Sequence, residues 1–359
     1  MAQAQGLTSQ AACWAKASLL CQEFEYADNQ PPNAKEPTVN RRLIVCLVAV
    51  LSFVAVAAGC SGDSQPAGGK MHIALIYKAT TNPFFQAMEK GARDKAKELG
   101  VDLLVQGIES ESDAEAQANI VRIMLNRKVD AIVIAPASSV GIVTPLMRAQ
   151  EAKVPIVNID NRIDKAEAAK QGLKIATFIG PDNFQGANLV GQYACDLIKK
   201  KLAAGTKGKV LILRGIDGVA NAEARKGGFE TAVLGAGLEV AASQSAEWDT
   251  AKAQTATSAM LSAHPDVQGI LCANDKMALG AIAACKGRDL LGKIVIVGYD
   301  NIDLARDAMK RGEMQATVEQ NPAMMGALGV ESAVKALKGE TLNPETPVPV
   351  KLITQADVK

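Results

Sequence analysis

The stretch "VPIVNIDN", residues 154–161, is an apolar run that ends in an aspartate and an asparagine. "IVIVGYDN", residues 294–301, repeats this pattern in the second half of the chain. Apolar runs without strict alternation are typical of parallel strands that helices cover on both faces. We therefore expect Asp160 and Asp300 to follow equivalent strands in two similar halves.

Two further blocks recur in the same order and support a duplication. "VDAIVIAP" at 129–136 matches "VQGILCAN" at 267–274. The ranges 91–100 and 228–237 also match, since each begins and ends with a glycine. Three blocks in one register indicate that the chain holds two halves of the same topology.

From Met71 onward, short runs rich in Ile and Val alternate with helical stretches, a pattern typical of βαβ units. We predict an α/β fold with two similar doubly wound parallel-sheet lobes and a ligand cleft between them. The expected strands are residues 72–77, 101–107, 130–136, 155–160, 175–180, 209–215, 238–243, 267–273 and 293–300.

Polar side chains follow several of these strands. In doubly wound sheets, ligands bind outside the carboxyl ends of the strands. Carboxylates, amides and a guanidinium can together donate to and accept from every hydroxyl of a small polyol. The residues in such positions are Asn82, Asp160, Arg225, Asn274 and Asp300.

Phe84 and Phe85 stand side by side where the first strand leads into a helix, although aromatic residues make up only 4% of the chain. Adjacent helical residues point about 100° apart, so both cannot face one core equally. The alternative is that both are ordinary core residues at a helix start. We favour a ligand role, because aromatic faces cover the apolar C–H faces of a sugar.

Composition excludes other classes of function. Lys plus Arg is 39 and Asp plus Glu is 38, which argues against a broad nucleic-acid surface. Neither of the two histidines has a partner at metal-ligand spacing, so we expect no metal site. No Walker A loop, GxGxxG motif or nucleophile with a partnered base is present, so we expect neither a cofactor nor catalysis.

The N-terminal part resembles a bacterial lipoprotein leader. Arg41 and Arg42 precede 17 residues without charge, 43–59, and Cys60 follows. A basic start, a short apolar region and a small-residue exit are typical of a secretory signal. The position three before Cys60 is alanine, where the lipoprotein pattern usually has leucine. The alternative is a membrane-spanning anchor, for which this run is short.

The leader defines three segments ahead of the folded part. Residues 39–59 are the expected signal peptide, and the polar stretch 60–70 is the expected tether behind a lipid on Cys60. Residues 1–38 show no sustained period and are expected to be a non-native or disordered extension. The alternative for them is a cytoplasmic tail. The mature chain is expected in the periplasm or cell envelope, anchored to a membrane.

The predicted folded part contains the motifs "NPFF" at 82–85, "ARKGGF" at 224–229, "HPDVQGILCANDKMALGA" at 264–281, "VGYDN" at 297–301 and "ATVEQNP" at 316–322. Through these motifs, residues 71–359 resemble the periplasmic sugar-binding proteins of the ribose-binding type (type I), the substrate-capturing components of ABC importers. The resemblance implies a monomer that closes over a monosaccharide or polyol and delivers it to permease subunits. It also implies three hinge strands between an N-terminal lobe, 71–180 plus 321–349, and a C-terminal lobe, 181–320 plus 350–359.

The resemblance also assigns ligand contacts by matching position. The phenylalanines sandwich the sugar together with Trp248 of the second lobe, and the remaining matches form hydrogen bonds. The implied contacts are Asn82, Phe84, Phe85, Asp160, Arg225, Trp248, Asn274, Asp300 and Gln320. The simpler alternatives are that Arg225 is a surface residue and that Asp160 and Asp300 cap helices.

Two departures from the ribose pattern leave the sugar open. Lys78 stands where ribose binders have a small hydroxyl residue, and Asn161 replaces an arginine, with Arg162 displaced by one. Lys78 can accommodate a carboxylate, a polyol terminus or an acidic hydroxy-ketone, and the alternative is that it points into solvent. We include Lys78 and Asn161 among the predicted ligand contacts.

Other functions share this bilobed core. A sensing receptor would relay occupancy by a sugar or furanosyl signal to a membrane partner, and the sequence does not distinguish it from an importer component. A transcription regulator would need a basic helix-turn-helix ahead of the core, where this chain has the secretion-like segment.

Overall fold

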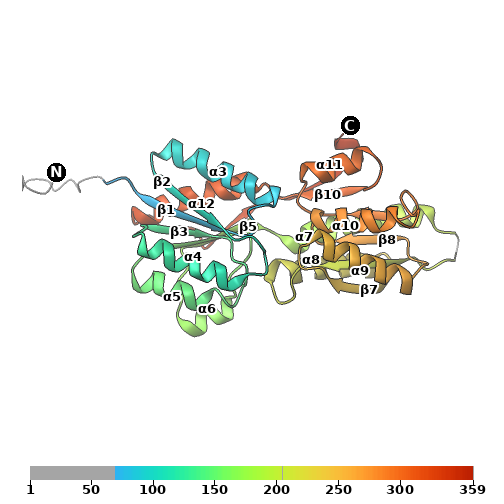
Figure 1. Ribbon diagram of the computed structural model, residues 1–359, viewed down its shortest axis with the longest axis horizontal. Helices are drawn as coiled ribbons and strands as arrows, with labels where there is room; N and C mark the ends of the chain where they lie inside the picture. Colours follow the sequence, from blue (N-terminus) through green and yellow to red (C-terminus); the bar gives the residue numbers. More distant parts are fainter. Residues whose placement is uncertain (1–68, 204, 359) are drawn as a thin grey trace, which may run out of the picture. The chain divides into compact units, whose positions relative to one another are not determined.

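The computed structural model describes residues 69–203 and 205–358. The extension 1–38, the signal 39–59, Cys60 and all but the end of the tether lie outside these residues. In the described part of the chain, no helix is long and apolar enough to cross a membrane. The described residues hold two sheets, each with helices on both faces (Figure 1).

The first sheet contains six strands, all parallel, in the order β11-β5-β4-β3-β1-β2. Alternate residues of β1 face two separate cores, with Ile73 and Leu75 on one side and Ala74 and Ile76 on the other. The strands are β1 (His72–Tyr77), β2 (Asp102–Gly107), β3 (Ala131–Ile134), β4 (Ile156–Ile159), β5 (Thr177–Pro181) and β11 (Glu345–Val348). The helices around this sheet are α3 (Pro83–Leu99), α4 (Ala114–Asn126), α5 (Val143–Glu151), α6 (Lys165–Gln171) and α12 (Pro322–Leu337).

The second sheet has the order β12-β10-β9-β8-β6-β7, with only β12 antiparallel. The strands are β6 (Lys209–Arg214), β7 (Glu239–Ser245), β8 (Gly269–Cys272), β9 (Val295–Val297), β10 (Ala316–Glu319) and β12 (Lys351–Thr354). The helices are α7 (Asn183–Lys201), α8 (Ala220–Gly235), α9 (Thr250–Ala263), α10 (Asp275–Lys286), α11 (Asp303–Lys310) and the 3-10 turn η1 (Gln355–Asp357).

The duplication predicted from the sequence is visible in the strand order. Five strands of the first sheet run β2-β1-β3-β4-β5, and five of the second run β7-β6-β8-β9-β10. All nine expected strands form, and the α/β fold of two mostly parallel sheets is confirmed. The strands β10, β11 and β12 were not among the expected apolar runs.

The first glycine of each repeated range lets two helices pack closely. A Cβ on Gly91 of α3 would lie 2.0 Å from the carbonyl oxygen of Ala323 in α12. A Cβ on Gly228 of α8 would lie 2.4 Å from the carbonyl oxygen of Phe184 in α7. A glycine at the helix contact therefore lets α3 pack against α12 in one half and α8 against α7 in the other.

The second glycine of each range ends the helix. Gly100 closes α3 with φ 68°, and Gly237 follows α8 with φ 76°. These left-handed conformations are favourable for glycine because it has no Cβ. In each half, the first glycine of the repeat therefore allows close helix packing, and the second ends the helix.

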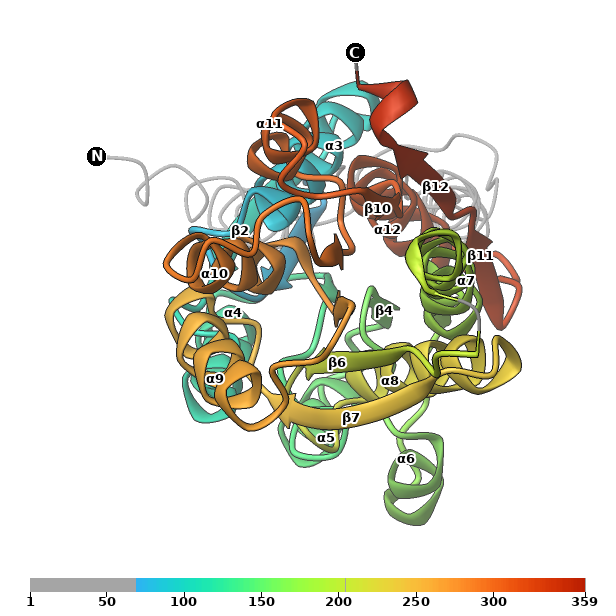
Figure 2. The same cartoon turned by 90° about the vertical axis from the view of Figure 1, so that its right-hand side faces the viewer.

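The chain passes between the two sheets at three places. These lie between β5 and α7, between β10 and α12, and between β11 and β12. Figure 2 shows β11 and β12 following one another beside α7. The lobe boundaries proposed from the sequence stay a proposal, and each of them lies near one of these crossings.

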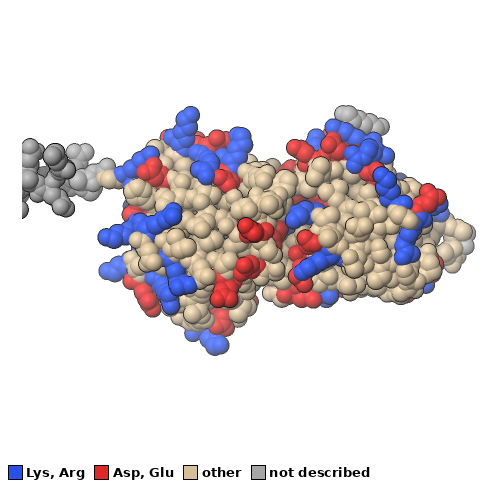
Figure 3. Space-filling view, in the orientation of Figure 1, with Lys and Arg blue, Asp and Glu red and all other residues tan. Residues whose placement is uncertain are grey.

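The charges on the described residues are mixed. The face shown in Figure 3 carries basic and acidic side chains interspersed. The three described cysteines, Cys195, Cys272 and Cys285, are free and buried, and burial raises the pKa of the Cys195 thiol to about 11. They pack as small apolar residues, as the sequence indicated.

Candidate functional site

Residues just beyond the carboxyl ends of strands from both sheets surround a small cavity, called here the central cavity. Its volume is about 20 Å³, roughly the space that one water molecule needs. A molecule the size of a sugar therefore enters only when the walls move apart. The lining residues are Lys78, Asn82, Phe84, Phe85, Glu111, Asp160, Asn221, Arg225, Trp248, Asn274, Asp300 and Gln320.

The central cavity brings together all of the predicted contacts except Asn161. It also includes Glu111 and Asn221, which sequence reasoning missed. Glu111 follows β2, so the rule that strand ends carry the site could have found it. Asn221 lies four residues before Arg225, on the same face of α8. The binding roles of all these residues stay predictions.

A helix cap holds the loop between β1 and α3. Asn82 precedes α3 and its side-chain oxygen accepts a hydrogen bond from the backbone N–H of Phe84 at 3.1 Å. Its amide nitrogen donates to Glu111 Oε1 at 3.1 Å. The rings of Phe84 and Phe85 meet edge to face, with centroids 5.0 Å apart. Both rings are buried and line the central cavity, so they combine packing with a wall of the site.

Lys78 is buried rather than solvated. Its side chain is 3% exposed, and Nζ lies 3.2 Å from Asp160 Oδ2 and 3.7 Å from Glu111 Oε2. The ammonium also lies 5.3 Å from the centre of the Phe85 ring. One cation between two carboxylates leaves this wall with a net negative charge and several groups able to bind hydroxyls.

The two equivalent aspartates both have a positive φ. Asp160 has φ 60° and Asp300 has φ 123°. Non-glycine residues with positive φ are uncommon and cluster at functional sites. The cap of α6 is Asp164, and Ile302 precedes α11. Neither Asp160 nor Asp300 caps those helices, which removes the simpler alternative.

Arg225 is fixed by two short hydrogen bonds. Nε donates to Asn183 Oδ1 and Nη1 donates to the Ala273 carbonyl, both at 2.8 Å. Two longer bonds join Nη1 to Asp300 Oδ1 at 3.4 Å and Nη2 to Gln320 Oε1 at 3.3 Å. The short bonds orient the guanidinium, and the long ones are those that a ligand oxygen can replace. The alternative of a surface arginine is wrong, since 3% of the side chain is exposed.

Aromatic rings surround the Arg225 guanidinium. It lies 3.8 Å from the centre of the Tyr299 ring and 5.5 Å from that of Trp248. Trp248 has φ 63°, and its indole lies so close to Gly215 that a Cβ there would be 2.1 Å from the ring. The indole is therefore packed tightly against Gly215 and forms part of the wall of the central cavity.

Asn274 and Gln320 also line the central cavity, on the side formed by the second lobe. Asn274 caps α10 by accepting a hydrogen bond from the backbone N–H of Met277 at 2.8 Å. Gln320, directly after β10, donates through Nε2 to Asp300 Oδ1 at 2.6 Å. Burial raises the pKa of Asp300 well above its usual value, and the Arg225 guanidinium opposes this shift.

Asn161 does not line the central cavity. Its amide nitrogen donates to the Pro136 carbonyl at 3.0 Å and to Ser139 Oγ at 3.3 Å. Its oxygen accepts from the backbone N–H of Asn221 at 3.2 Å. These contacts join the end of β4 to the start of α8. In this structure Asn161 links the two halves instead of lining the central cavity, and its ligand contact stays a prediction.

Arg162 stands one residue after the position at which ribose binders have an arginine. Its side chain does not line the central cavity either. Its guanidinium lies 3.8 Å from the centre of the Phe178 ring. It forms two hydrogen bonds to the Glu345 carboxylate, at 2.9 and 3.1 Å. The single-residue displacement thus directs this arginine to β11 rather than to the central cavity.

A buried carboxylate holds the loop that presents Asp300. Asp275 Oδ2 accepts from the backbone N–H of Ile302 at 3.0 Å, and Oδ1 accepts from Thr317 Oγ1 at 2.7 Å. Thr317 Oγ1 in turn accepts from the Asn301 N–H at 3.2 Å. Burial raises the pKa of Asp275 to about 6, although these hydrogen bonds lower it.

We expect Asp275 to make stability depend on pH. A carboxyl whose pKa is raised in the folded state stabilises the fold below its unfolded pKa, and that contribution is lost as pH rises through about 6. Relative to Asp275→Asn, the wild-type free energy of unfolding should fall by about 2 kcal/mol between pH 4 and 7, at about 1.4 kcal/mol per pKa unit. Urea titrations of both proteins measure this difference. A difference that does not change with pH contradicts the expectation.

The fold and the central cavity define a binding protein that encloses a small polar molecule between two α/β lobes. In the described residues, no group of three His, Cys, Asp or Glu side chains is placed to hold a metal ion. A family model described as a periplasmic binding protein domain matches residues 73–341. The chain belongs to the periplasmic binding protein family.

Individual relatives match most of the chain. The D-ribose/D-allose-binding protein of Pseudomonas aeruginosa is 38% identical over 325 residues, which cover 88% of this chain and 98% of the relative. The D-allose-binding periplasmic protein of Escherichia coli is 37% identical over 272 residues, covering 76% and 86%. An ABC transporter periplasmic solute-binding protein from Actinobacillus succinogenes, solved with D-allose, is 36% identical with a TM-score of 0.74, covering 80% and 99%.

Proposed function

We propose that the chain is the sugar-binding component of an ABC importer and holds a monosaccharide in the central cavity. The observation that carries this proposal is the cavity itself. Buried phenylalanines line it beside Trp248, and Asp160, Arg225, Asn274 and Asp300 add groups that pair with hydroxyls. The sugar selects and holds the closed state by contacts with both lobes. The chain itself catalyses no reaction and passes the sugar to membrane permease subunits.

D-Allose is the first sugar to test. Relatives of this chain are named for D-allose and D-ribose, and one solved relative contains D-allose. Calorimetric titration with D-allose, D-ribose, other monosaccharides, sugar alcohols, furanosyl compounds and amino acids provides the test. We expect micromolar or tighter binding of a neutral sugar. Binding of an amino acid with no response to any sugar or polyol contradicts the proposal.

Lys78→Ser should change which sugar binds best. Lys78 and its partner Glu111 add hydrogen-bonding groups where the ribose pattern has a small hydroxyl. A hydrogen bond to a charged group is worth roughly 1.5–3 kcal/mol, so the best ligand of the wild type should lose about 10- to 100-fold in affinity. D-Ribose should lose little. Since specificity is a difference of affinities, both ligands are titrated into both proteins. Equal losses for the two sugars would show that Lys78 has no role in specificity.

We also propose that the chain is secreted to the periplasm and anchored by a lipid on Cys60, as a monomer. The support is the order of a basic pair, an uncharged run and a cysteine at residues 41–60. Native mass spectrometry of the membrane fraction from a bacterial host should show a chain that begins at a lipid-modified Cys60. A product that keeps residues 43–59 and an unmodified cysteine excludes the anchor, and a dimer mass excludes the monomer.

A further inference from the structure

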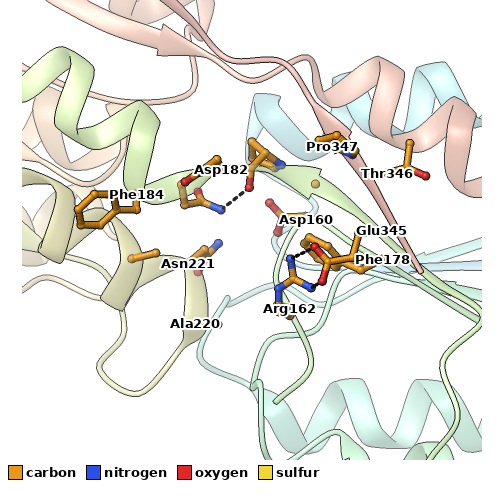
Figure 4. Close-up of a pocket in the computed structure, with 14 residues that line it drawn as sticks. Asp160, Arg162, Phe178, Asp182, Phe184, Ala220, Asn221, Glu345, Thr346 and Pro347 are labelled. Carbon is orange, nitrogen blue, oxygen red and sulfur yellow. Dashed lines mark hydrogen bonds and ion pairs between the residues drawn. The ribbon is translucent and has the colours of Figure 1, made fainter. Parts of the chain in front are cut away.

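A second, larger cavity adjoins the central cavity and is called here the side pocket. Its volume is about 550 Å³, against about 20 Å³ for the central cavity. This lies within the range of roughly 300–1,000 Å³ that is usual for ligand pockets. Asp160 and Asn221 line both cavities. Figure 4 shows these two side chains facing the side pocket from the end of β4 and from α8.

The shared wall holds two acceptor oxygens that lack hydrogen-bond donors. Asp160 Oδ2 and Asn221 Oδ1 are buried without a hydrogen-bond partner, and these residues are 2% and 5% exposed. Lys78 Nζ lies 3.2 Å from Asp160 Oδ2 and pairs with its charge, but it is not aligned for a hydrogen bond. A buried acceptor without a donor costs about 1–3 kcal/mol, so a ligand hydroxyl at this wall is strongly favoured.

The remaining walls suit a neutral group with apolar surface. The Arg162 guanidinium is stacked on Phe178 and paired with Glu345, so its charge is already compensated. Asp182 adds a further carboxylate, which opposes an anionic group such as a phosphate. The Phe184 side chain, 44% exposed, offers an apolar edge.

We propose that the side pocket is a second subsite for a neutral substituent on the bound sugar. The substituent, an alkyl group or a second sugar unit, is carried by a sugar oxygen next to the free hydroxyl that donates to Asp160 and Asn221. The protein therefore accepts an O-substituted sugar or glycoside as well as the free monosaccharide. This inference rests on the proposed function, because it requires a sugar in the central cavity.

The test compares O-methyl derivatives of the free sugar that binds best. Each probe carries one methyl group, at the anomeric oxygen or at one of the hydroxyls. We expect one position to be tolerated within about 10-fold of the parent sugar. Methylation at the other positions should weaken binding at least 100-fold, because the walls of the central cavity leave no room.

Filling the side pocket should abolish that tolerance. Ala224 lines the side pocket but not the central cavity. Ala224→Trp should weaken the tolerated derivative at least 10-fold and leave the free sugar within about 3-fold. Leu234→Trp on the same helix, where the leucine is 71% exposed, is the matched control and should change neither affinity.

The outcomes separate this inference from the proposed function. Binding of the free sugar with no methylated derivative tolerated overturns the subsite alone. If Ala224→Trp does not change the affinity of the tolerated derivative, the subsite is also overturned, because the substituent then lies outside the side pocket. Failure of every free sugar to bind overturns the proposed function, and the subsite with it.

Discussion

Replacing Arg225 by alanine is expected to weaken binding of the cognate sugar by at least about 100-fold. The guanidinium is already oriented by Asn183 and the Ala273 carbonyl, so little entropy is lost when a ligand replaces its two long bonds. Two charge-assisted hydrogen bonds at roughly 1.5–3 kcal/mol each account for a loss of this size. Calorimetric titration of the purified variant measures it.

Two controls keep this result interpretable. Arg225→Lys keeps a cation but not the planar fork, so it should recover only a small part of the affinity. Thermal unfolding shows whether the variant is folded, because alanine also leaves the buried Asp300 without its cation. A folded Arg225→Ala protein with wild-type affinity means that Arg225 only supports the fold.

Gly91→Val is expected to reduce the free energy of unfolding by about 3 kcal/mol or more. A Cβ at this position would lie 2.0 Å from a backbone oxygen of α12, so the two helices must move apart. Overpacking costs typically 1–3 kcal/mol, and a clash with backbone falls at or above the upper end. For a chain of this size we expect the melting temperature to fall by roughly 5 °C or more.

The matched control is Gly235→Ala at the end of α8. No atom lies within 4 Å of the Cβ that this change adds. Alanine is favoured over glycine in a helix by roughly 0.5–1 kcal/mol, so this variant should be slightly more stable than the wild type. If both variants unfold at the wild-type temperature, the close contact between α3 and α12 does not limit stability.

Residues placed by local rules were predictable from the sequence. Asp160 and Asp300 follow apolar runs in the two repeats, and the structure gives both a positive φ at the edge of the central cavity. Phe84 and Phe85 were predictable because the residues before them form a helix start. In each case, the signal is contained in a few neighbouring residues.

Residues placed by contacts distant in sequence were not predictable. The position of Asn161 depends on Pro136, Ser139 and Asn221, each at least 22 residues away. The strand β11 has no apolar run and contains Pro347. Such a segment can only be an edge strand, and its pairing with β5 makes it one.

The three crossings also determine how the chain behaves when it is incomplete. The strands β11 and β12 lie at the edges of different sheets, and only two residues separate them. A chain cut before Glu345 therefore leaves β5 and β10 unpaired on one side, in both halves at once. Unpaired strand edges are templates for aggregation. The segment that holds β11 and β12 thus covers an edge strand in each half. A premature stop before it exposes strand edges in both lobes rather than in one.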